Sequence, residues 1–252
     1  MKSLLKRHKK RRPPAIEPVP SSLPGLRGAE MAAVFSGRRQ SGDFYDAVRI
    51  NPSRVVFGLL DLPAPRRESN EHLLSVLQGV FRAGAQLLKS AGVNEPDALI
   101  ELCLQLNRAV IETAGIGHSS PAFGGCYNED LGTVCYFNAG HTPGLVRDSS
   151  NVSELGATGL PLGLFSHVTA DARMSALEPG AALLLVSQSV VAAKRSGEQY
   201  GLRRVEETLK TTQRVNAHDL CAAVLQATEG FASKPQPEDM TALALVRHRS
   251  TG

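Results

Sequence analysis

Acidic residues next to apolar runs are the side chains of this sequence best suited to metal chemistry. Asp43 precedes one such run and Asp61 ends the next. Glu238 and Asp239 precede the last apolar run of the chain. Hard cations such as Mg²⁺ and Mn²⁺ prefer carboxylate oxygens, and a pair of ions about 4 Å apart activates water for attack on phosphate. The pattern therefore indicates an oxygen-ligand metal site if the fold brings these carboxylates together.

Two apolar runs on either side of Asn51–Ser53 predict a β-hairpin that positions Asp43 and Asp61. Pro52 presets φ and Asn51 can bond its own backbone, so these residues favour a turn. With the turn centred on Pro52, facing residue numbers sum to 104 and Asp43 lies opposite Asp61. A four-residue turn gives a sum of 105 and makes the two diagonal neighbours. Facing like charges are destabilising unless a cation lies between them, so the pair is either a cation site or two ordinary strand-end aspartates.

The charge of the chain is concentrated at its N-terminus. The sequence has 252 residues, 28 of them Lys or Arg and 24 Asp or Glu. Seven of the basic residues lie within residues 1–12, which hold no acid, so the rest carries 21 basic and 24 acidic residues. We expect residues 1–24, basic and then proline-rich, to be a disordered or extended tail. A solvated tail is favoured over one that contacts anionic lipid or nucleic acid, and the folded body shows no basic bias toward nucleic acid.

Other sequence features are typical of a soluble cytoplasmic protein. Hydrophobic residues make up 42% and charged residues 21% of the chain. The longest apolar run, Ala181–Val186, is too short to span a membrane, and the N-terminus lacks the apolar core of a signal peptide. The four cysteines form no CxxC pair and no zinc spacing, so we expect reduced, buried thiols: Cys103, Cys126, Cys135 and Cys221.

The order of predicted elements indicates one α+β domain over residues 25–248 with largely antiparallel sheet. A strand over Leu26–Phe35 and the hairpin are followed by two helices with apolar stripes, then by short strands with glycine and proline punctuation. The remaining predicted elements are a buried strand at Ala181–Ser187, helices at Leu202–Leu209 and Ala217–Phe231, and a strand at Met240–Val246.

Six features, in this order, resemble one family. They are Ser41–Asp46, the strand ending in Asp61, Phe137–Pro143 with its Asn-Ala-Gly-His, Ala157–Gly163 with its Thr-Gly-Leu-Pro-Leu-Gly, Pro179–Ser187 and Glu238–Thr241. The chain is similar to the SpoIIE-like branch of the metal-dependent PPM (protein phosphatase 2C) superfamily of serine/threonine phosphatases. The resemblance implies an α-β-β-α sandwich of two antiparallel sheets flanked by helix pairs, with metals at one edge between the sheets.

The resemblance also implies the ligands of up to two Mn²⁺ or Mg²⁺ ions. Asp43 matches the first metal-binding aspartate, Asp61 matches the bridging one, and the carbonyl of Leu62 is the usual neighbouring ligand. Glu238 stands where the family has aspartate, and Asp239 beside it is a second carboxylate. No side chain is a nucleophile in this family, because a metal-activated water attacks phosphorus directly.

Three departures from the family pattern bear on this metal site. Where the family has a third aspartate after the buried strand, this chain has Gln188, which is neutral. Glu238 keeps the charge but has one more methylene, and the segment after Asp61 has no glycine. Because affinity for hard cations follows ligand charge, metal binding should be weaker than in the family.

Two functions follow from the resemblance. The first is an attenuated phosphatase that removes phosphate from serine or threonine of a regulatory protein such as an anti-anti-sigma factor. The second is a pseudophosphatase that keeps the fold and binds a phosphoprotein in a partner-switching pathway without turnover. The sequence assigns no oligomeric state.

Three loop residues and one further aspartate complete the candidate set. Asn138, Gly140 and His141 form the family-motif loop, where a structural histidine is favoured over a general acid. Asp46 should point to the opposite face of its strand from Asp43, which makes it a structural hydrogen-bond acceptor.

Overall fold

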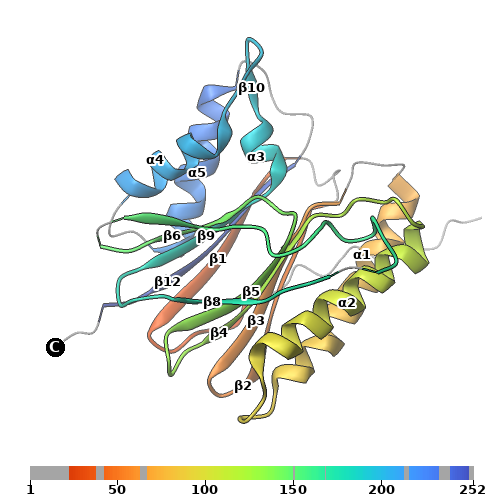
Figure 1. The fold of residues 1–252 in the computed structure, drawn as a ribbon. Coiled ribbons are helices and arrows are strands. Elements are labelled where there is room, and N and C mark those ends of the chain that lie inside the picture. The colour runs from red at the N-terminus through yellow and green to blue at the C-terminus, as the bar shows by residue number, and fades with distance from the viewer. Residues whose placement is uncertain are drawn as a thin grey trace, which may run out of the picture.

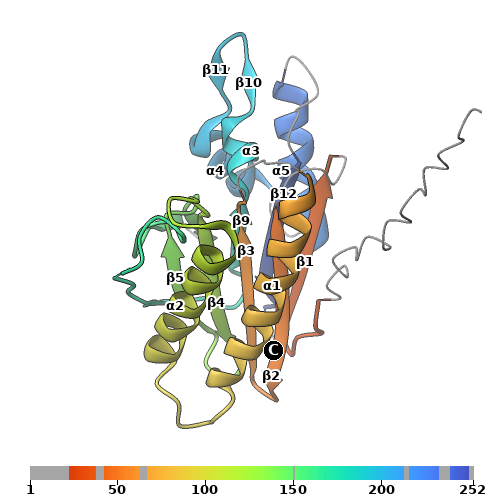
Figure 2. The same cartoon turned by 90° about the vertical axis from the view of Figure 1, so that its right-hand side faces the viewer.

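The protein is built from four layers. The computed structural model describes residues 23–37, 43–62, 67–149, 151–167, 169–212, 216–232 and 239–249. Two five-stranded sheets lie face to face, and a pair of helices covers each outer face (Figure 1 and Figure 2). The α-β-β-α sandwich expected from the sequence is confirmed.

The first sheet contains the predicted hairpin. Its strand order is β2-β3-β4-β5-β8, and all its neighbouring strands are antiparallel. The strands are β2 (Phe44–Asn51), β3 (Arg54–Leu60), β4 (Ala122–Asn128), β5 (Thr133–Ala139) and β8 (Arg173–Ala176). Every residue of β3 is buried, since helices cover one face of the strand and the second sheet covers the other.

The second sheet joins the two ends of the described chain. Its strand order is β1-β12-β9-β6-β7, again antiparallel. The strands are β1 (Ala29–Ser36), β12 (Met240–Arg247), β9 (Ala182–Val186), β6 (Gly144–Arg147) and β7 (Val152–Leu155). β12 runs between β1 and β9, so the start of β12 and the end of β9 lie at the same end of the sandwich.

Amphipathic helices cover the outside of both sheets. α1 (Arg67–Ala85) and α2 (Glu95–Ala114), joined through a short 3-10 helix at Gln86–Leu88, pack on the first sheet (Figure 1). α4 (Gly201–Thr211) and α5 (Ala217–Phe231) pack on the second. Asn216 is the N-cap of α5 as predicted, because its side-chain oxygen accepts a hydrogen bond from the backbone N–H of Asp219 at 2.8 Å.

Alternation of side chains along the strands divides the apolar residues into three cores. On β3, Phe57 and Leu59 point into the core between the sheets, while Val56 and Leu60 point into the core beneath α1 and α2. A third core lies between the second sheet and α4 and α5. An odd-numbered residue at the end of β3 therefore faces the space between the two sheets.

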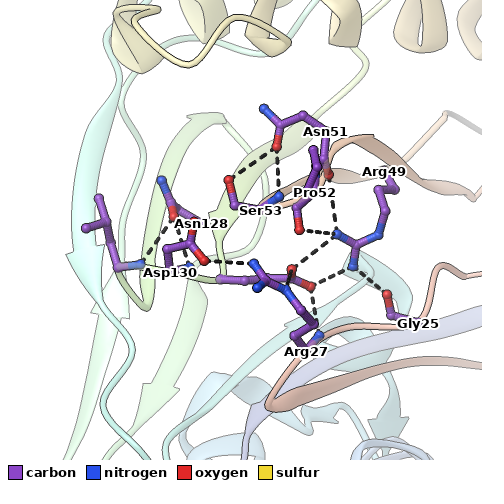
Figure 3. Close-up of polar contacts among 10 residues, drawn as sticks. Gly25, Arg27, Arg49, Asn51, Pro52, Ser53, Asn128 and Asp130 are labelled. Carbon is purple, nitrogen blue, oxygen red and sulfur yellow. Dashed lines mark hydrogen bonds and ion pairs between the residues drawn. The ribbon is translucent and has the colours of Figure 1, made fainter.

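The register of the hairpin decides between the two pairings that the sequence left open. Phe44 faces Leu60 and Arg49 faces Val55, which are pairs that sum to 104. The sum becomes 105 only next to the turn, where Asn51 pairs with Arg54 after an irregularity in the ladder. The predicted turn is confirmed: the Asn51 side chain accepts a hydrogen bond from the backbone N–H of Ser53 at 2.9 Å (Figure 3).

A buried carboxylate ties this turn to the rest of the fold. Glu129 accepts hydrogen bonds from Arg49 (Nη2 to Oε1, 2.6 Å) and from Arg27, whose backbone N–H donates at 2.9 Å. Arg49 also donates to the carbonyls of Gly25 and Pro52, so the arginines of Figure 3 hold the segment of Gly25 and Arg27 against the turn. These ion pairs lower the pKa of Glu129 against the raising effect of its own burial.

Three small features were not predicted from the sequence. They are strand β8, the five-residue helix α3 (Gln188–Ala192), and a hairpin of β10 (Lys194–Arg195) and β11 (Glu198–Gln199) that projects beyond the helices (Figure 2). The turn of this hairpin has positive φ at Ser196 (50°) and Gly197 (88°). Such a turn matches the twist of two-residue β-hairpins, which explains how so short a pairing closes.

Several expectations lie partly outside the described residues. The tail is described only at Leu23 and Pro24, and Leu23 packs against the core between the sheets. Ser41, Gly42, the segment 63–66 and Glu238 are not among the described residues. The cysteines are buried and unpaired, as expected. Within the described part of the chain, no helix combines the length and apolar character that a membrane crossing requires.

Candidate metal centre

The hairpin places Asp43 and Asp61 side by side between the sheets. Asp43 directly precedes β2 and Asp61 directly follows β3, and the register of the ladder puts the two opposite each other. Both are odd-numbered, so their side chains continue the rows that form the inter-sheet core. Asp61 retains only 8% of its accessible surface. Two carboxylates, one partly buried and one buried, therefore converge at the edge of the inter-sheet core.

Hydroxyl groups from the second sheet orient the Asp43 carboxylate. Thr241 of β12 donates from Oγ1 to Asp43 Oδ2 at 2.9 Å, and the Ser187 hydroxyl also bonds this carboxylate. Burial and the neighbouring charge of Asp61 together raise the pKa of Asp43 to about 7, against the lowering effect of the two hydroxyls. The site therefore favours a positive charge, either a proton or a cation, beside Asp43.

Asp61 is held by the backbone that follows β9. The N–H of Gln188, the first residue of α3, donates to Asp61 Oδ2 at 3.1 Å. The backbone N–H of Asp61 donates to the carbonyl of Pro121 at 2.9 Å, which fixes the end of β3 beside β4. The Gln188 residue is exposed, and its side-chain Oε1 accepts a hydrogen bond from Thr142 Oγ1 at 3.2 Å. Gln188 therefore lies between the two carboxylates and the solvent, and the solvent-facing side of the centre at Gln188 is called its mouth below.

A buried imidazole completes the group around Asp61. His141 Nδ1 lies 2.8 Å from the carbonyl of Thr142, and His141 Nε2 lies 3.4 Å from Asp61 Oδ2. A carbonyl oxygen can only accept, so Nδ1 carries a proton. Burial lowers the pKa of His141 to about 4, which keeps the ring neutral. The Nε2 atom therefore presents a lone pair on the side of the Asp61 carboxylate.

The other two residues of the family-motif loop shape the backbone. Asn138 is fully buried, accepts from the backbone N–H of His141 at 2.8 Å, and donates from Nδ2 to the carbonyl of Leu155 at 3.1 Å. Gly140 has φ of 67°, and a Cβ atom there would lie 2.4 Å from Cγ of Pro161. Asn138 and Gly140 therefore hold the turn that carries His141, and the structural role expected for this loop fits these contacts.

Replacing Gly140 by alanine should destabilise the protein by about 2–3 kcal/mol, because a left-handed backbone and a close contact with Pro161 are then combined. The matched control is Gly156→Ala, where an added Cβ would meet nothing within 4 Å. Urea unfolding of both variants measures the difference. Equal midpoints for the two variants would contradict the role assigned to Gly140.

The remaining predicted ligands lie nearby with different surroundings. The Leu62 side chain is buried in the core beneath α1 and α2. Asp239 is 2% exposed and packs under the end of β1, where a Cβ on Gly37 would lie 2.2 Å from Asp239 Oδ1. Asp46 is buried on the opposite face from Asp43 and accepts from Arg82 at 2.7 Å, which agrees with its predicted structural role.

The donors present fit one divalent cation better than two. Among the described residues, no three His, Cys, Asp or Glu side chains are grouped as a ready metal site. Asp43 and Asp61 still bring two repelling carboxylates together, and such a pair is stabilised by a shared cation. Sequence reasoning found this pair but not Thr241 and Ser187 as its supports, although both residues end motifs of the family pattern.

Comparison with known proteins identifies the family. The profile of Stage II sporulation protein E (SpoIIE) matches residues 72–248. The chain belongs to the SpoIIE family. No curated protein sequence matches this SpoIIE-family chain.

Solved structures share the SpoIIE fold at low sequence identity. The RsbU and RsbW domains of a Mycobacterium tuberculosis protein match with a TM-score of 0.74 and 21% identity, over 91% of this chain and 64% of that one. The SiaA-PP2C domain of Pseudomonas aeruginosa matches with a TM-score of 0.71 and 16% identity, over 86% of this chain and 85% of that one. A third structure contains the PP2C phosphatase domain and a fragment of the regulatory domain of SpoIIE from Bacillus subtilis. It matches with a TM-score of 0.73 and 14% identity, over 89% of this chain and 63% of that one. This chain thus spans just under two thirds of the first and third structures, and the three matches support the fold.

Proposed function

We propose that this chain is a metal-dependent protein serine/threonine phosphatase of reduced activity. The observation that carries the proposal is the pair of the partly buried Asp43 and the buried Asp61, brought together by the hairpin and supported from the second sheet. The cation would supply charge neutralisation for a phosphoryl group and an acidified water. No Ser, Cys or His nucleophile is required by this arrangement.

Each residue of the centre has a distinct task in this proposal. Asp43 and Asp61 hold the cation, and the Thr241 and Ser187 hydroxyls fix the orientation of Asp43. The Gln188 N–H fixes Asp61 while the Gln188 side chain borders the solvent-facing mouth. The phosphate group of a substrate would approach from this mouth, because the opposite side is filled by the inter-sheet core.

Reduced activity follows from the charge of the centre. Gln188 contributes no negative charge, and the family pattern has an aspartate in its place. The affinity of a site for divalent cations depends on the number of charged ligands, and two carboxylates are too few to neutralise two such ions. We propose binding of one Mn²⁺ or Mg²⁺ ion with Asp43 and Asp61, with the carbonyl of Leu62, Glu238 and Asp239 as further ligands where they can reach.

The proposed substrate is a phosphoserine or phosphothreonine on a small regulatory protein, such as an anti-anti-sigma factor, in the cytoplasm. The support is the SpoIIE family membership together with the RsbU and RsbW domains and the SpoIIE phosphatase among the structural neighbours. In this proposal the phosphorylated side chain of the partner would reach the centre past the exposed residue Gln188.

The test is Mn²⁺-dependent release of phosphate from an aryl phosphate. The wild-type chain should show turnover above background that Asp61→Asn abolishes, because the variant removes one of two charges from the centre. Asp171→Asn is the control, since Asp171 is exposed and its side chain pairs only weakly with Arg173, 3.9 Å away. Turnover at the level of buffer alone, in folded protein at millimolar Mn²⁺, would rule out the phosphatase.

A non-catalytic binding module is the second candidate, and the internal hydrogen bonds favour it. Thr241 and the Gln188 N–H already donate to the two carboxylates, so the chain stabilises the centre in part without a cation. Binding of a phosphorylated anti-anti-sigma factor should then survive both Asp43→Asn and Asp61→Asn, as measured by calorimetry. A clearly active wild-type enzyme would exclude this candidate.

Binding of Mn²⁺ should become weaker as the pH falls below about 7. The pKa of Asp43 is raised to about 7, mainly by burial and then by Asp61, so below this value a proton competes with the cation. Affinity should fall up to tenfold per pH unit below about 7 and level off above it. Calorimetric titrations between about pH 5.5 and 8.5, in buffers of different ionisation enthalpy, measure both the affinity and the released proton.

The raised pKa of Asp43 also makes the stability of the metal-free protein depend on pH. A folded-state pKa above the ordinary carboxyl value means that the folded state holds a proton that the unfolded chain has lost. Stability contributed by this group should therefore decrease as the pH rises from about 4 to about 7. Asp43→Asn should remove this decrease in stability. A constant Mn²⁺ affinity between about pH 5.5 and 8.5 would contradict a raised pKa of Asp43 at the metal site.

A further inference from the structure

The outer edge of β1 is open in the part of the protein that the structure describes. β1 is the first strand in the order β1-β12-β9-β6-β7, so only its inner edge pairs with a strand, in an uninterrupted ladder with β12. Proteins usually protect such an edge with lysine, proline, a bulge or a very short strand. β1 has none of these features, and its one charged residue, Glu30, is held by the backbone N–H of Ala217 on α5 at 2.9 Å. The edge therefore lacks the features that keep strands from pairing between molecules.

The hydrogen bonds of the sheet determine which backbone groups of β1 point to the open edge. The N–H of His248 donates to the carbonyl of Gly28 at 2.8 Å, and bonded and non-bonded pairs alternate along an antiparallel ladder. The even-numbered residues of β1 therefore bond to β12. The next pair, Arg247 with Ala29, follows this rule, since the N–H of Arg247 donates away from β1 to the carbonyl of Ala181 at 2.9 Å. The odd-numbered residues of β1 direct their N–H and C=O groups outward.

Met31 and Ala33 are the odd-numbered residues in the middle of this edge. Among the described residues, neither has a hydrogen-bond partner for its outward N–H and C=O groups. Their side chains pack against the core between the sheets, and those of Ala32 and Val34 against the core beneath α4 and α5. All four residues are only partly buried, whereas β12 beside them is buried in all but its last residue. Both faces of β1 are thus covered, and its exposure lies at the edge.

We propose that β1 pairs with β1 of a second copy of this chain in antiparallel orientation. A two-fold axis through Ala32 places Met31 opposite Ala33 of the second copy, so that the outward N–H and C=O groups of both residues bond across the interface. Glu30 then faces Val34, so no like charges meet. Facing residues of an antiparallel pair lie on the same side of the sheet, so each core of one copy continues into the same core of the other.

A second copy fits this edge better than a single peptide strand does. An added peptide would have a new open edge of its own, whereas the pairing of two β1 strands leaves neither edge unpaired. An added strand also needs apolar cover on both faces, because β1 is packed on both. A second copy brings that cover in the form of its own α4, α5 and first sheet. This interface does not depend on metal binding or turnover at the centre.

Sedimentation equilibrium of the full chain tests the pairing. The mass should rise from 26.9 kDa toward twice that value as the concentration increases from about 1 µM to about 1 mM. Ala33→Pro removes an outward N–H that makes no bond to β12, and proline is tolerated at such edge positions, so the variant should fold and dimerise at least about tenfold more weakly. Glu154→Pro is the control and should leave dimerisation unchanged, because Glu154 is an exposed residue of the edge strand β7 whose N–H also points away from its neighbour β6.

Backbone amide hydrogen exchange of the wild type identifies the interface directly. The Met31 and Ala33 amides should exchange more slowly as the concentration rises, while the Ala32 and Val34 amides, bonded to β12, should be protected at every concentration. Three results would each overturn the proposal: a chain that stays monomeric at the highest concentration, a dimer whose Met31 and Ala33 amides exchange as fast as in the monomer, or a folded Ala33→Pro variant that dimerises like the wild type. The exchange is measured on the wild type, so the proposal stays testable if Ala33→Pro does not fold.

Discussion

Replacing Arg54 by methionine should reduce the free energy of unfolding by about 3–5 kcal/mol. Arg54 Nε lies 2.6 Å from Glu95 Oε1, and the two side chains are only 10% and 9% exposed. Arg54 also donates to the carbonyls of Ser90 and Ala91, so it ties β3 to the turn before α2. Methionine fills most of the same volume, but it leaves Glu95 as a buried charge whose remaining side-chain donor is Asn128 at 3.3 Å.

Chemical denaturation at neutral pH measures this loss, and two variants check its cause. Arg203→Met removes an exposed arginine that pairs with Glu207 one turn along α4, and should change stability by no more than about 0.5 kcal/mol. Changing Glu95 to leucine together with Arg54→Met removes both charges and should restore part of the stability. A loss below about 1 kcal/mol for Arg54→Met would show that Glu95 is solvated in the folded state.

The parts of the fold that could be predicted are those whose sequence pattern is local. The hairpin follows from Asn51 and Pro52 between two apolar runs, and helix α5 begins at its predicted cap, Asn216. Both rest on interactions between residues close in sequence, which a single sequence displays. The pairing of β1 with β12 joins residues about 200 positions apart, and no local sequence pattern predicted it.

The missed elements are short and depend on their surroundings. Helix α3 has five residues, and its N-cap Ser187 makes no side-chain cap hydrogen bond to the helix. Isolated helices of that length are not stable, so α3 depends on tertiary contacts such as the bond from the Gln188 N–H to Asp61. Strand β8 has no fully buried residue. Its sequence therefore lacks the apolar run from which a strand could be predicted.

The candidate site also has features that the sequence predicts and features that depend on the folded surroundings. Asp43 and Asp61 could be paired from the sequence because strand register is simple arithmetic once the turn is placed. The direction of the His141 ring could not, since it depends on the Thr142 carbonyl, Asn138 and Phe123 at once. The sequence therefore favoured a structural histidine, whereas the orientation of Nε2 brings it to the carboxylate.

Restoring a carboxylate at position 188 should strengthen Mn²⁺ binding at least about tenfold. Gln188→Asp places a negative charge at the mouth of the centre, on the residue whose N–H already contacts Asp61. Without metal, three neighbouring carboxylates repel one another, so the variant should be less stable than the wild type by about 1 kcal/mol. With saturating Mn²⁺ the order should reverse, because a tenfold gain in affinity adds about 1.4 kcal/mol to the folded state.

Thermal unfolding with and without Mn²⁺, together with phosphate release, measures this reversal. Gln199→Asp makes the same chemical change at an exposed position of the β10–β11 hairpin and should leave Mn²⁺ affinity unchanged. A rise in both Mn²⁺ affinity and turnover for Gln188→Asp alone would show that the loss of charge at Gln188 limits an otherwise competent centre. Stronger binding without any turnover would place the defect elsewhere in the centre and favour the binding module, while unchanged binding would contradict the position of Gln188 at the metal.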